Sequence, residues 1–378
     1  MKTLFVAGTW DLNGGKESGL IKKIYLELTK YSELNIDYYN GGNYNDLNNI
    51  LNSTMNYDIV FWMANVPNDL EKIRNVKEVN PKTMLITSKR NNNEYSFQEL
   101  IQKALASKSN LVIEFSKKED IYQMQLFDPL GNIWFSGTDT KAFVKSLVDR
   151  LLFIQKITRQ STIQDEENTG ALAWFFNMFK QEMYQDETKF NDLNIKEKED
   201  FLTLVKNYAS IFASATMETK DVKRFLGNAS FRCLKGFPSF RNDKYILVTK
   251  RNVNKEHITI DDFVPVYLEN EKLYYQGNFK PSVDTPIQVR LYEKLPNINY
   301  MIHSHCYIKN APITTNSLPC GAIEEVDEVL DLIEEKYGDF SKDFYILNLK
   351  GHGSIMMSND VEKLKNIEII GRKLPEIM

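Results

Sequence analysis

Short apolar runs alternate with amphipathic helical patterns from residue 2 to about residue 155, and this alternation restricts the fold more than any other feature. The apolar runs have the length and composition of buried strands, and the segments between them repeat apolar residues every three to four positions. Such a chain is expected to form a mainly parallel α/β sheet with helices on both faces. The expected strands are Thr3–Ala7, Ile36–Tyr39, Ile59–Met63, Met84–Thr87 and Leu111–Phe115, and the expected helices are Gly19–Leu28, Leu70–Val79 and Phe97–Ala106.

A hairpin and a closing helix are expected to complete this first domain. Residues 128–132 have turn chemistry and separate two apolar runs, and Thr140 is placed to cap a helix that reaches about Ile154. Polar and charged residues then predict a connecting segment over residues 156–195. This segment contains an apolar helical stripe that would dock on a domain or on another subunit, formed by Trp174, Phe175, Met178 and Phe179.

The rest of the chain mixes short strands with few helices, which is typical of an α+β domain. A helix over residues 196–213 leads into it. The expected strands are Tyr245–Thr249, Val264–Leu268, Tyr300–Ile302 and Phe344–Leu347, and the expected helices are Thr285–Leu295, Ile323–Tyr337 and Val361–Lys373. A length of 378 residues suits two domains, which we place at residues 1–155 and 196–378.

Charge and cysteine content exclude several classes of protein. The chain has 47 basic and 51 acidic residues, so it lacks the positive excess that nucleic-acid binding needs. Cys233, Cys306 and Cys320 are too few and too widely spaced for a secreted disulfide framework. The first residues lack the order of a signal peptide, and no apolar stretch has the length of a membrane span. We therefore expect a cytoplasmic protein without nucleic-acid or membrane partners.

Three of the four histidines lie in the last quarter of the chain. His303 and His305 follow the apolar run 300–302, and residues two positions apart on a strand point to the same face. Two such imidazoles suit a zinc ion, and His352, whose flanking glycines permit close approach, would be the third ligand of an open catalytic site. A His-x-His pair alone is also common as a polar stripe on an exposed strand, so the upstream residues decide.

Four motifs in a fixed order make the C-terminal half resemble the class II aldolase/adducin superfamily. They are Gly-Asn-Ala-Ser-Phe-Arg at 227–232, Lys-Pro-Ser-Val-Asp at 280–284, His-Ser-His at 303–305 and His-Gly at 352–353. The resemblance is nearest to the L-ribulose-5-phosphate 4-epimerase and L-fuculose-phosphate aldolase types, and Asp284 stands where the aldolases have glutamate. It implies a class II aldolase-like domain. The adducins share this fold but lack the metal histidines.

The resemblance also implies a divalent cofactor, Zn²⁺ or another metal, held by His303, His305 and His352. In the family the carboxylate that matches Asp284 lies near the metal as a ligand or as a proton-transfer group. From the residues alone, Asp284 could instead be the N-cap of the helix that Thr285 and Pro286 open.

The resemblance implies a small-molecule substrate, a phosphorylated sugar. It also implies a homo-oligomer, most often a tetramer, with its sites at the subunit boundaries. Phosphate-binding positions of the family fall on Asn228, Ser282 and a loop that here reads Thr249, Lys250, Arg251. The two cations could hold a phosphate or carboxylate, or lie in a solvated loop. Three departures from the family follow. Val283 replaces a family serine, and the segment after His305 is short and has no counterpart of an acidic residue that the epimerases use. The family's C-terminal tail is also missing, so the resemblance specifies no substrate.

A glycine-rich loop joins the first strand to the first helix. Backbone amides and the helix dipole there could face a nucleotide-like or sugar-like ligand. The spacing matches neither the dinucleotide-binding nor the P-loop motif, and a flexible turn is the alternative. The candidate ligand residues are Gly8, Thr9, Asp11, Gly14 and Gly15.

Three functions are compatible with these features. The first is a zinc-dependent carbon–carbon bond lyase or epimerase acting on a phosphorylated sugar or a related hydroxy-carbonyl compound. The second is a dehydratase or decarboxylase that uses the same metal. The third is a non-catalytic ligand-sensing or scaffold protein whose aldolase-like domain serves assembly. The complete histidine triad favours an enzyme, whereas the short segment after His305 favours the scaffold.

Overall fold

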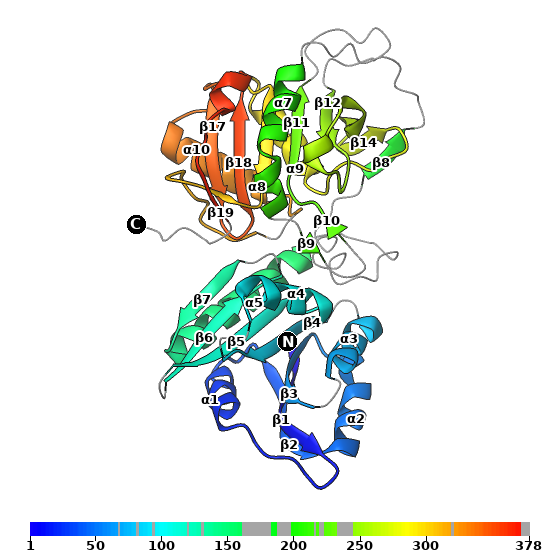
Figure 1. Cartoon of the computed structure of the whole chain (residues 1–378), viewed down its shortest axis with the longest axis vertical. Coiled ribbons are helices and arrows are strands. Elements are labelled where there is room, and N and C mark those ends of the chain that lie inside the picture. Colours follow the sequence, from blue (N-terminus) through cyan, green and yellow to red (C-terminus); the bar gives the residue numbers. More distant parts are fainter. Residues whose placement is uncertain are drawn as a thin grey trace. The chain divides into compact units, whose positions relative to one another are not determined.

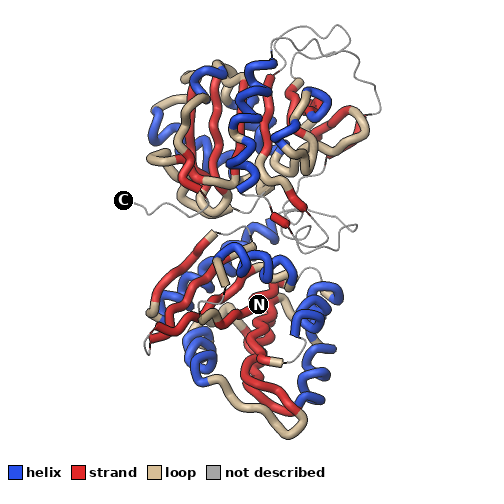
Figure 2. The backbone as a smooth tube through the Cα atoms, in the orientation of Figure 1, coloured by secondary structure: helices blue, strands red, loops and turns tan. Residues whose placement is uncertain are grey.

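The computed structural model describes residues 1–66, 69–80, 83–92, 95–118, 121–129, 132–160, 183–186, 198–214, 217–218, 223–232, 245–318 and 321–371. The chain divides into two compact units, Met1–Phe175 and Phe176–Met378. Figures 1 and 2 show the elements of each unit. The expected domain limits at residues 155 and 196 stay predictions, and the expected stripe at 174–179 lies outside the described residues.

The first unit contains a seven-stranded sheet in the order β2-β1-β3-β4-β5-β6-β7. The first five strands of this order pair in parallel, and β6 and β7 continue the sheet as an antiparallel hairpin. The expected parallel α/β sheet is therefore confirmed for this unit. Its elements are β1 (Lys2–Asp11), α1 (Gly19–Leu28), β2 (Asn35–Asn43), α2 (Tyr44–Asn52), η1 (Thr54–Asn56), β3 (Ile59–Asn65), α3 (Asp69–Val79), β4 (Met84–Arg90), α4 (Phe97–Ala106), β5 (Leu111–Lys118), β6 (Ile121–Phe127), β7 (Ile133–Gly137) and α5 (Thr140–Gln160).

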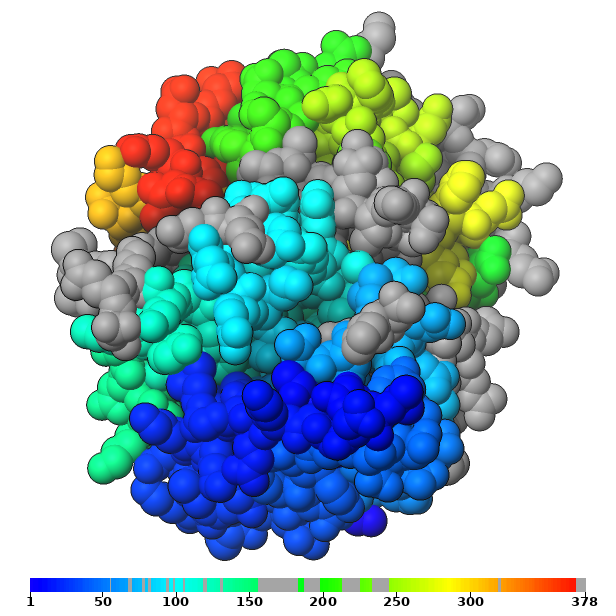
Figure 3. All heavy atoms as spheres, turned by 60° about the horizontal axis from the view of Figure 1, so that its bottom comes forward, coloured from blue at the N-terminus to red at the C-terminus, as the bar shows by residue number. Residues whose placement is uncertain are grey.

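Both faces of the central strands are buried because alternate side chains pack against different helices. Leu4 of β1 and Trp62 of β3 share one apolar cluster with residues of α2 and α3. On β1 the neighbouring Phe5 stacks on Phe61 and meets the ring of Tyr25 from α1 edge-on. The strands consequently have nearly continuous apolar sequences. In Figure 3 the blue N-terminal residues lie together on one face of this unit.

Two local details of this unit differ from expectation. The cap of α5 is Asp139 and not Thr140, because the Asp139 carboxylate accepts from the amides of Lys141 and Ala142. Helix α2 was not expected, since its asparagine-rich sequence has low helix propensity. Its Asn43 cap and its buried Leu47 and Ile50 stabilise it instead.

The second unit contains an eight-stranded sheet in the order β17-β18-β15-β11-β12-β13-β14-β8. All its neighbouring strands are antiparallel except β14 and β8. One apolar cluster packs α9 and α10 on the sheet, and another packs α7 and α8 on it. The elements are β8 (Met183–Asp186), α7 (Glu199–Asn207), α8 (Ala209–Ser214), β9 (Met217–Glu218), β10 (Lys223–Arg224), β11 (Asn228–Arg232), β12 (Ile246–Thr249), η3 (Lys255–His257), η4 (Ile260–Asp262), β13 (Phe263–Glu269), β14 (Lys272–Gln276), α9 (Thr285–Lys294), β15 (Tyr300–Ser304), β16 (Tyr307–Ile308), α10 (Glu325–Tyr337), β17 (Phe344–Leu349), β18 (Gly353–Ser358), η5 (Val361–Leu364) and β19 (Ile369–Gly371).

The expected helix Val361–Lys373 is wrong. The chain forms the short η5 and then the strand β19, and residues 372–378 lie outside the described part. Asn366 has a φ of +62°, a left-handed conformation that ends a right-handed helix. The expected helix 196–213 is also divided into α7 and α8 at Tyr208, whose hydroxyl donates to the carbonyl of Leu364. Among the described residues, no helix is both long and apolar enough to cross a membrane.

Candidate metal centre

Strand β15 places two of the three candidate histidines. It lies between β11 and β18, with His303 paired to Asn228 on one side and to Ile355 on the other. His305 follows directly after the strand, two positions from His303, so the backbone alternation directs both imidazoles to one side. His352 lies in the tight turn that joins β17 to β18, next to β15. The antiparallel sheet thereby joins residues that are about fifty positions apart.

The glycine after His352 serves backbone packing. Gly353 has a φ of +132°, and a Cβ atom there would lie 2.0 Å from the carbonyl oxygen of Ser304. A side chain at this position would push β18 away from β15 exactly beside the histidines, so Gly353 keeps the two strands together. The sequence-based reason for this glycine, close approach to a metal, was therefore incomplete.

Asp284 occupies the N-cap position of α9, yet its side chain forms no capping hydrogen bond. The amide Nδ2 of Asn228 instead donates to Asp284 Oδ2 at 3.2 Å. The capping alternative for this carboxylate is thus not supported by the geometry, and the side chain faces the histidines.

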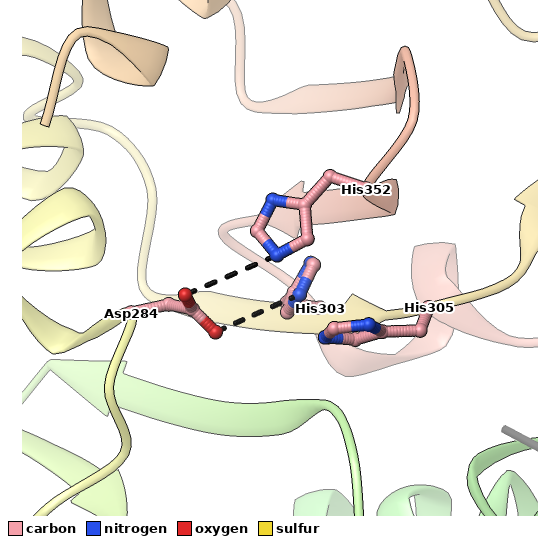
Figure 4. A group of neighbouring side chains, drawn as sticks. All are labelled: Asp284, His303, His305 and His352. Atoms are coloured by element: carbon pink, nitrogen blue, oxygen red, sulfur yellow. Dashed lines mark ion pairs between the residues drawn. The ribbon is translucent and has the colours of Figure 1, made fainter. Parts of the chain in front are cut away.

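The four side chains form one compact, buried cluster (Figure 4). Their candidate ligand atoms all lie within 4.8 Å of one another. The ring centroids of the imidazoles are 4.5–4.9 Å apart. Asp284 Oδ2 lies 3.7 Å from His303 Nε2, and Asp284 Oδ1 lies 3.9 Å from His352 Nε2. A single ion could therefore be reached by all four residues, each of which is at most 6% exposed.

Hydrogen bonds on the outer side of the cluster hold the Nδ1 atoms of His303 and His352. His303 Nδ1 lies 2.9 Å from the carbonyl oxygen of Ser354, which can only accept, so Nδ1 is the protonated nitrogen. His352 Nδ1 lies 2.9 Å from both oxygens of Glu325. Within the part of the chain that the structure describes, the buried Nε2 atoms of His303 and His352 have no hydrogen-bond partner. Buried nitrogens directed at a carboxylate suit a divalent cation.

The electrostatic surroundings of the two rings differ. Burial, followed by the neighbouring His352, lowers the pKa of His303 to about 4. Burial also acts to lower the pKa of His352, but the charge and hydrogen bond of Glu325, with a contribution from Asp284, raise it to about 9. Neutral His303 can bind an ion directly at pH 7. His352 has to release a proton from Nε2, so uptake of metal should release protons.

Two residues that the sequence did not indicate support this cluster. Gln288 Nε2 donates to Asn228 Oδ1, which turns the Asn228 amide so that its NH₂ group faces Asp284 and Ser282. Glu325, the first residue of α10, binds His352. An acidic residue in the first turn of a helix normally complements the helix dipole, so no sequence signal distinguished Glu325 from its neighbours.

The candidate phosphate-binding residues are largely engaged by the protein itself. Asn228 is fully buried, and its NH₂ group donates to Ser282 and Asp284. The hydroxyl of Thr249 accepts from the Ala229 amide, and Lys250 forms an ion pair with Asp262 at 2.6 Å. The backbone amide of Arg251 donates to the carbonyl of Lys280. A phosphate-binding role for this set stays a prediction.

The candidate residues Gly8, Thr9 and Asp11 belong to β1, which is longer than expected, and only Gly14 and Gly15 lie in the loop after it. The amide of Thr9 donates to the carbonyl oxygen of Lys16, and the amide of Lys16 donates to Thr9 Oγ1. The amide of Gly15 donates to the carbonyl oxygen of Gly42. A Cβ atom on Gly8, whose φ is +76°, would lie 2.5 Å from the Gly41 nitrogen. Gly8 therefore permits close approach of β1 to β2 and to the carbonyl of Lys16. A ligand at Gly8, Thr9, Asp11, Gly14 and Gly15 stays a prediction.

Comparisons with solved structures gave similarities at low identity. An L-fuculose 1-phosphate aldolase has 15% identity and a TM-score of 0.30, with 44% of this chain and 82% of that chain covered. L-fuculose 1-phosphate aldolase from Glaciozyma antarctica PI12 has 12% identity and a TM-score of 0.28, with 46% and 70% covered. The DNA/pantothenate metabolism flavoprotein from Streptococcus pneumoniae has 15% identity and a TM-score of 0.32, with 41% and 99% covered.

Comparison with curated proteins gave no match. The family model described as "Class II Aldolase and Adducin N-terminal domain" matches residues 213–369. This range includes the four motifs, and with them Asp284 and the three clustered histidines. Residues 213–369 therefore form a domain of the class II aldolase and adducin family, as the four motifs implied.

Proposed function

We propose that the second unit is a zinc-dependent lyase or epimerase that acts on a carbon–carbon bond of a phosphorylated sugar or a related hydroxy-carbonyl compound. The observation that carries this proposal is the buried cluster in which three imidazoles and one carboxylate lie within 4.8 Å of one another. The family match over residues 213–369 supports the reaction class.

The three histidines are the residues that would hold the ion. Three neutral nitrogen ligands with a further position left open are typical of catalytic zinc sites. When bound, the ion acts as a Lewis acid on a substrate oxygen and stabilises the negative charge that develops there. The Nδ1 hydrogen bonds of His303 and His352 keep the Nε2 atoms directed inward.

Asp284 is the residue that would move the proton. Its carboxylate is held by the Asn228 amide and lies beside the position where substrate would meet the histidines. A positioned carboxylate of this kind can accept a proton from a substrate hydroxyl and return it to carbon or oxygen. The burial of the cluster excludes bulk water and strengthens these electrostatic interactions.

Metal analysis combined with a substrate panel tests the proposal. Purified protein is expected to contain about one zinc per chain, which His303→Ala and His352→Ala should lose. His257 is exposed and outside the cluster, so His257→Ala is the matched control. Retro-aldol, epimerase, dehydratase and decarboxylase turnover would then be measured over pentose and hexulose phosphates. Protein without metal, or metal that survives both cluster variants, would favour the scaffold function.

A further inference from the structure

Glu325 is a buried carboxylate placed on a rigid element. It is 3% exposed and begins α10 (Glu325–Tyr337). The following residues Val326, Val329 and Ile333 anchor this helix in the apolar cluster of the sheet. Burial of a carboxylate costs several kcal/mol unless it is well paired. The partner that compensates the burial of Glu325 therefore shows what this carboxylate does.

His352 is the only side chain among the described residues to which Glu325 is hydrogen-bonded. Both carboxylate oxygens lie 2.9 Å from Nδ1, so the ring is held in one plane and one tautomer. The opposite nitrogen, Nε2, is directed toward Asp284 at 3.9 Å. Glu325 thus acts on the cluster through His352 and does not reach it directly.

The outer partners of the two rings differ in charge. His303 donates to a neutral backbone carbonyl, whereas His352 donates to a carboxylate. A negative outer partner increases the electron density of the imidazole and makes it a stronger ligand. Asp284 and Glu325 together also bring two carboxyl groups into one buried region.

We propose that Glu325 is a positioning residue of the metal centre, which orients His352 and increases the affinity of the cluster for a divalent cation. This inference depends on the proposed function, because it assumes that the histidines hold a metal. It adds a residue that lies outside the four motifs and 27 positions before its histidine. Glu325 is expected to change the affinity for the ion, whereas Asp284 remains the group that moves the proton.

Glu325→Gln is the first test, because glutamine keeps the shape and an acceptor oxygen but removes the charge. The zinc dissociation constant of the full chain would be measured by competition with a chelator. Loss of such an outer partner typically weakens metal affinity about 10–100-fold, and this is the expected result. Glu324→Gln, which removes the same charge from the preceding, partly exposed residue, should leave the affinity unchanged.

Stability of the metal-free protein separates positioning from a structural role. Glu325→Gln should still fold, although it loses the buried pair with His352 and should melt at a lower temperature than the wild-type apoprotein. Glu325→Leu should also fold and should bind zinc more weakly than Glu325→Gln, because it has no acceptor for Nδ1. If neither variant folds, Glu325 is structural and the proposal is overturned.

Two further outcomes are distinguishable. Wild-type affinity in Glu325→Gln and Glu325→Leu, with zinc still lost in His352→Ala, would refute the role of Glu325 alone. Failure of the wild-type chain to bind zinc would refute the proposed function itself. The visible spectrum of the cobalt-substituted protein adds a readout, because a reoriented His352 should change the ligand field of the ion.

Discussion

Replacement of Asp284 by asparagine should abolish most turnover while the fold and the metal are retained. In the structure Asp284 Oδ2 accepts from Asn228, and Oδ1 is the oxygen nearer to His352 Nε2. Asparagine at this position can direct its oxygen toward Asn228 and place its NH₂ group where Oδ1 of Asp284 lies, near His352 Nε2. The substitution therefore preserves shape and one hydrogen bond, and removes the negative charge and the ability to accept a proton.

The size of each effect follows from these contacts. Loss of a positioned acid–base group typically reduces the rate by about 10²–10⁴-fold, which corresponds to about 3–5 kcal/mol in the activation free energy. The free energy of unfolding should change by only about 1 kcal/mol, because the retained hydrogen bond has a neutral acceptor in place of a charged one. Helix α9 should be unaffected, since Asp284 makes no capping hydrogen bond.

The assay compares zinc content, urea denaturation and turnover on the best substrate of the panel. Asp261→Asn, an exposed acidic residue of η4, is the matched control and should behave as wild type. If Asp284→Asn unfolded the chain but kept full activity per folded molecule, the carboxylate would be a structural cap and its proton-transfer role would be abandoned. Loss of zinc together with activity would instead make Asp284 an essential ligand.

Three other outcomes are expected. Gly353→Ala should destabilise the chain in denaturation experiments by about 1–2 kcal/mol of backbone strain plus about 1–3 kcal/mol of overpacking. Gly338 has a φ of +87°, and among the described residues no atom lies within 4 Å of a Cβ built there, so Gly338→Ala should show the strain alone. Equal effects of the two substitutions would contradict the contact with Ser304. Burial lowers the pKa of Lys255 to about 7 from the ordinary value of 10.5, so the unfolded state binds more protons between these pH values. The free energy of unfolding of the metal-free wild type should therefore rise from pH 7 to pH 10 relative to that of Lys255→Met. Parallel pH profiles of the two proteins would show that the amine stays charged. Light scattering should give a mass near four times 44.0 kDa if the family's tetramer forms, and a monomer at micromolar concentration would contradict it.

Periodicity in the sequence was sufficient for the first unit. The expected helices Gly19–Leu28 and Phe97–Ala106 have the same bounds as α1 and α4, and each expected strand lies within an observed one. These segments carry strong local signals, because parallel strands buried on both faces are apolar throughout. Weak local signals failed, as with the asparagine-rich α2, whose stability comes from its cap and its packing.

Residue spacing and motif order were similarly sufficient to select the four residues of the buried cluster. The two-residue spacing was enough to predict that His303 and His305 share a face, the flanking glycines indicated His352, and the resemblance added a site role for Asp284. Local pattern failed again at the C-terminal end, where an apparently helical segment contains Asn366 in a left-handed conformation.

The tertiary structure alone decided what surrounds these residues. The sequence by itself determined the parallel sheet, the histidine triad and its acidic neighbour, because these depend on local periodicity and on motifs of a few residues. It contained no sign that Glu325 supports His352 or that Gln288 orients Asn228, since these partners are 27 and 60 positions apart. Such contacts arise only when the antiparallel sheet and its packed helices bring distant side chains within hydrogen-bond distance.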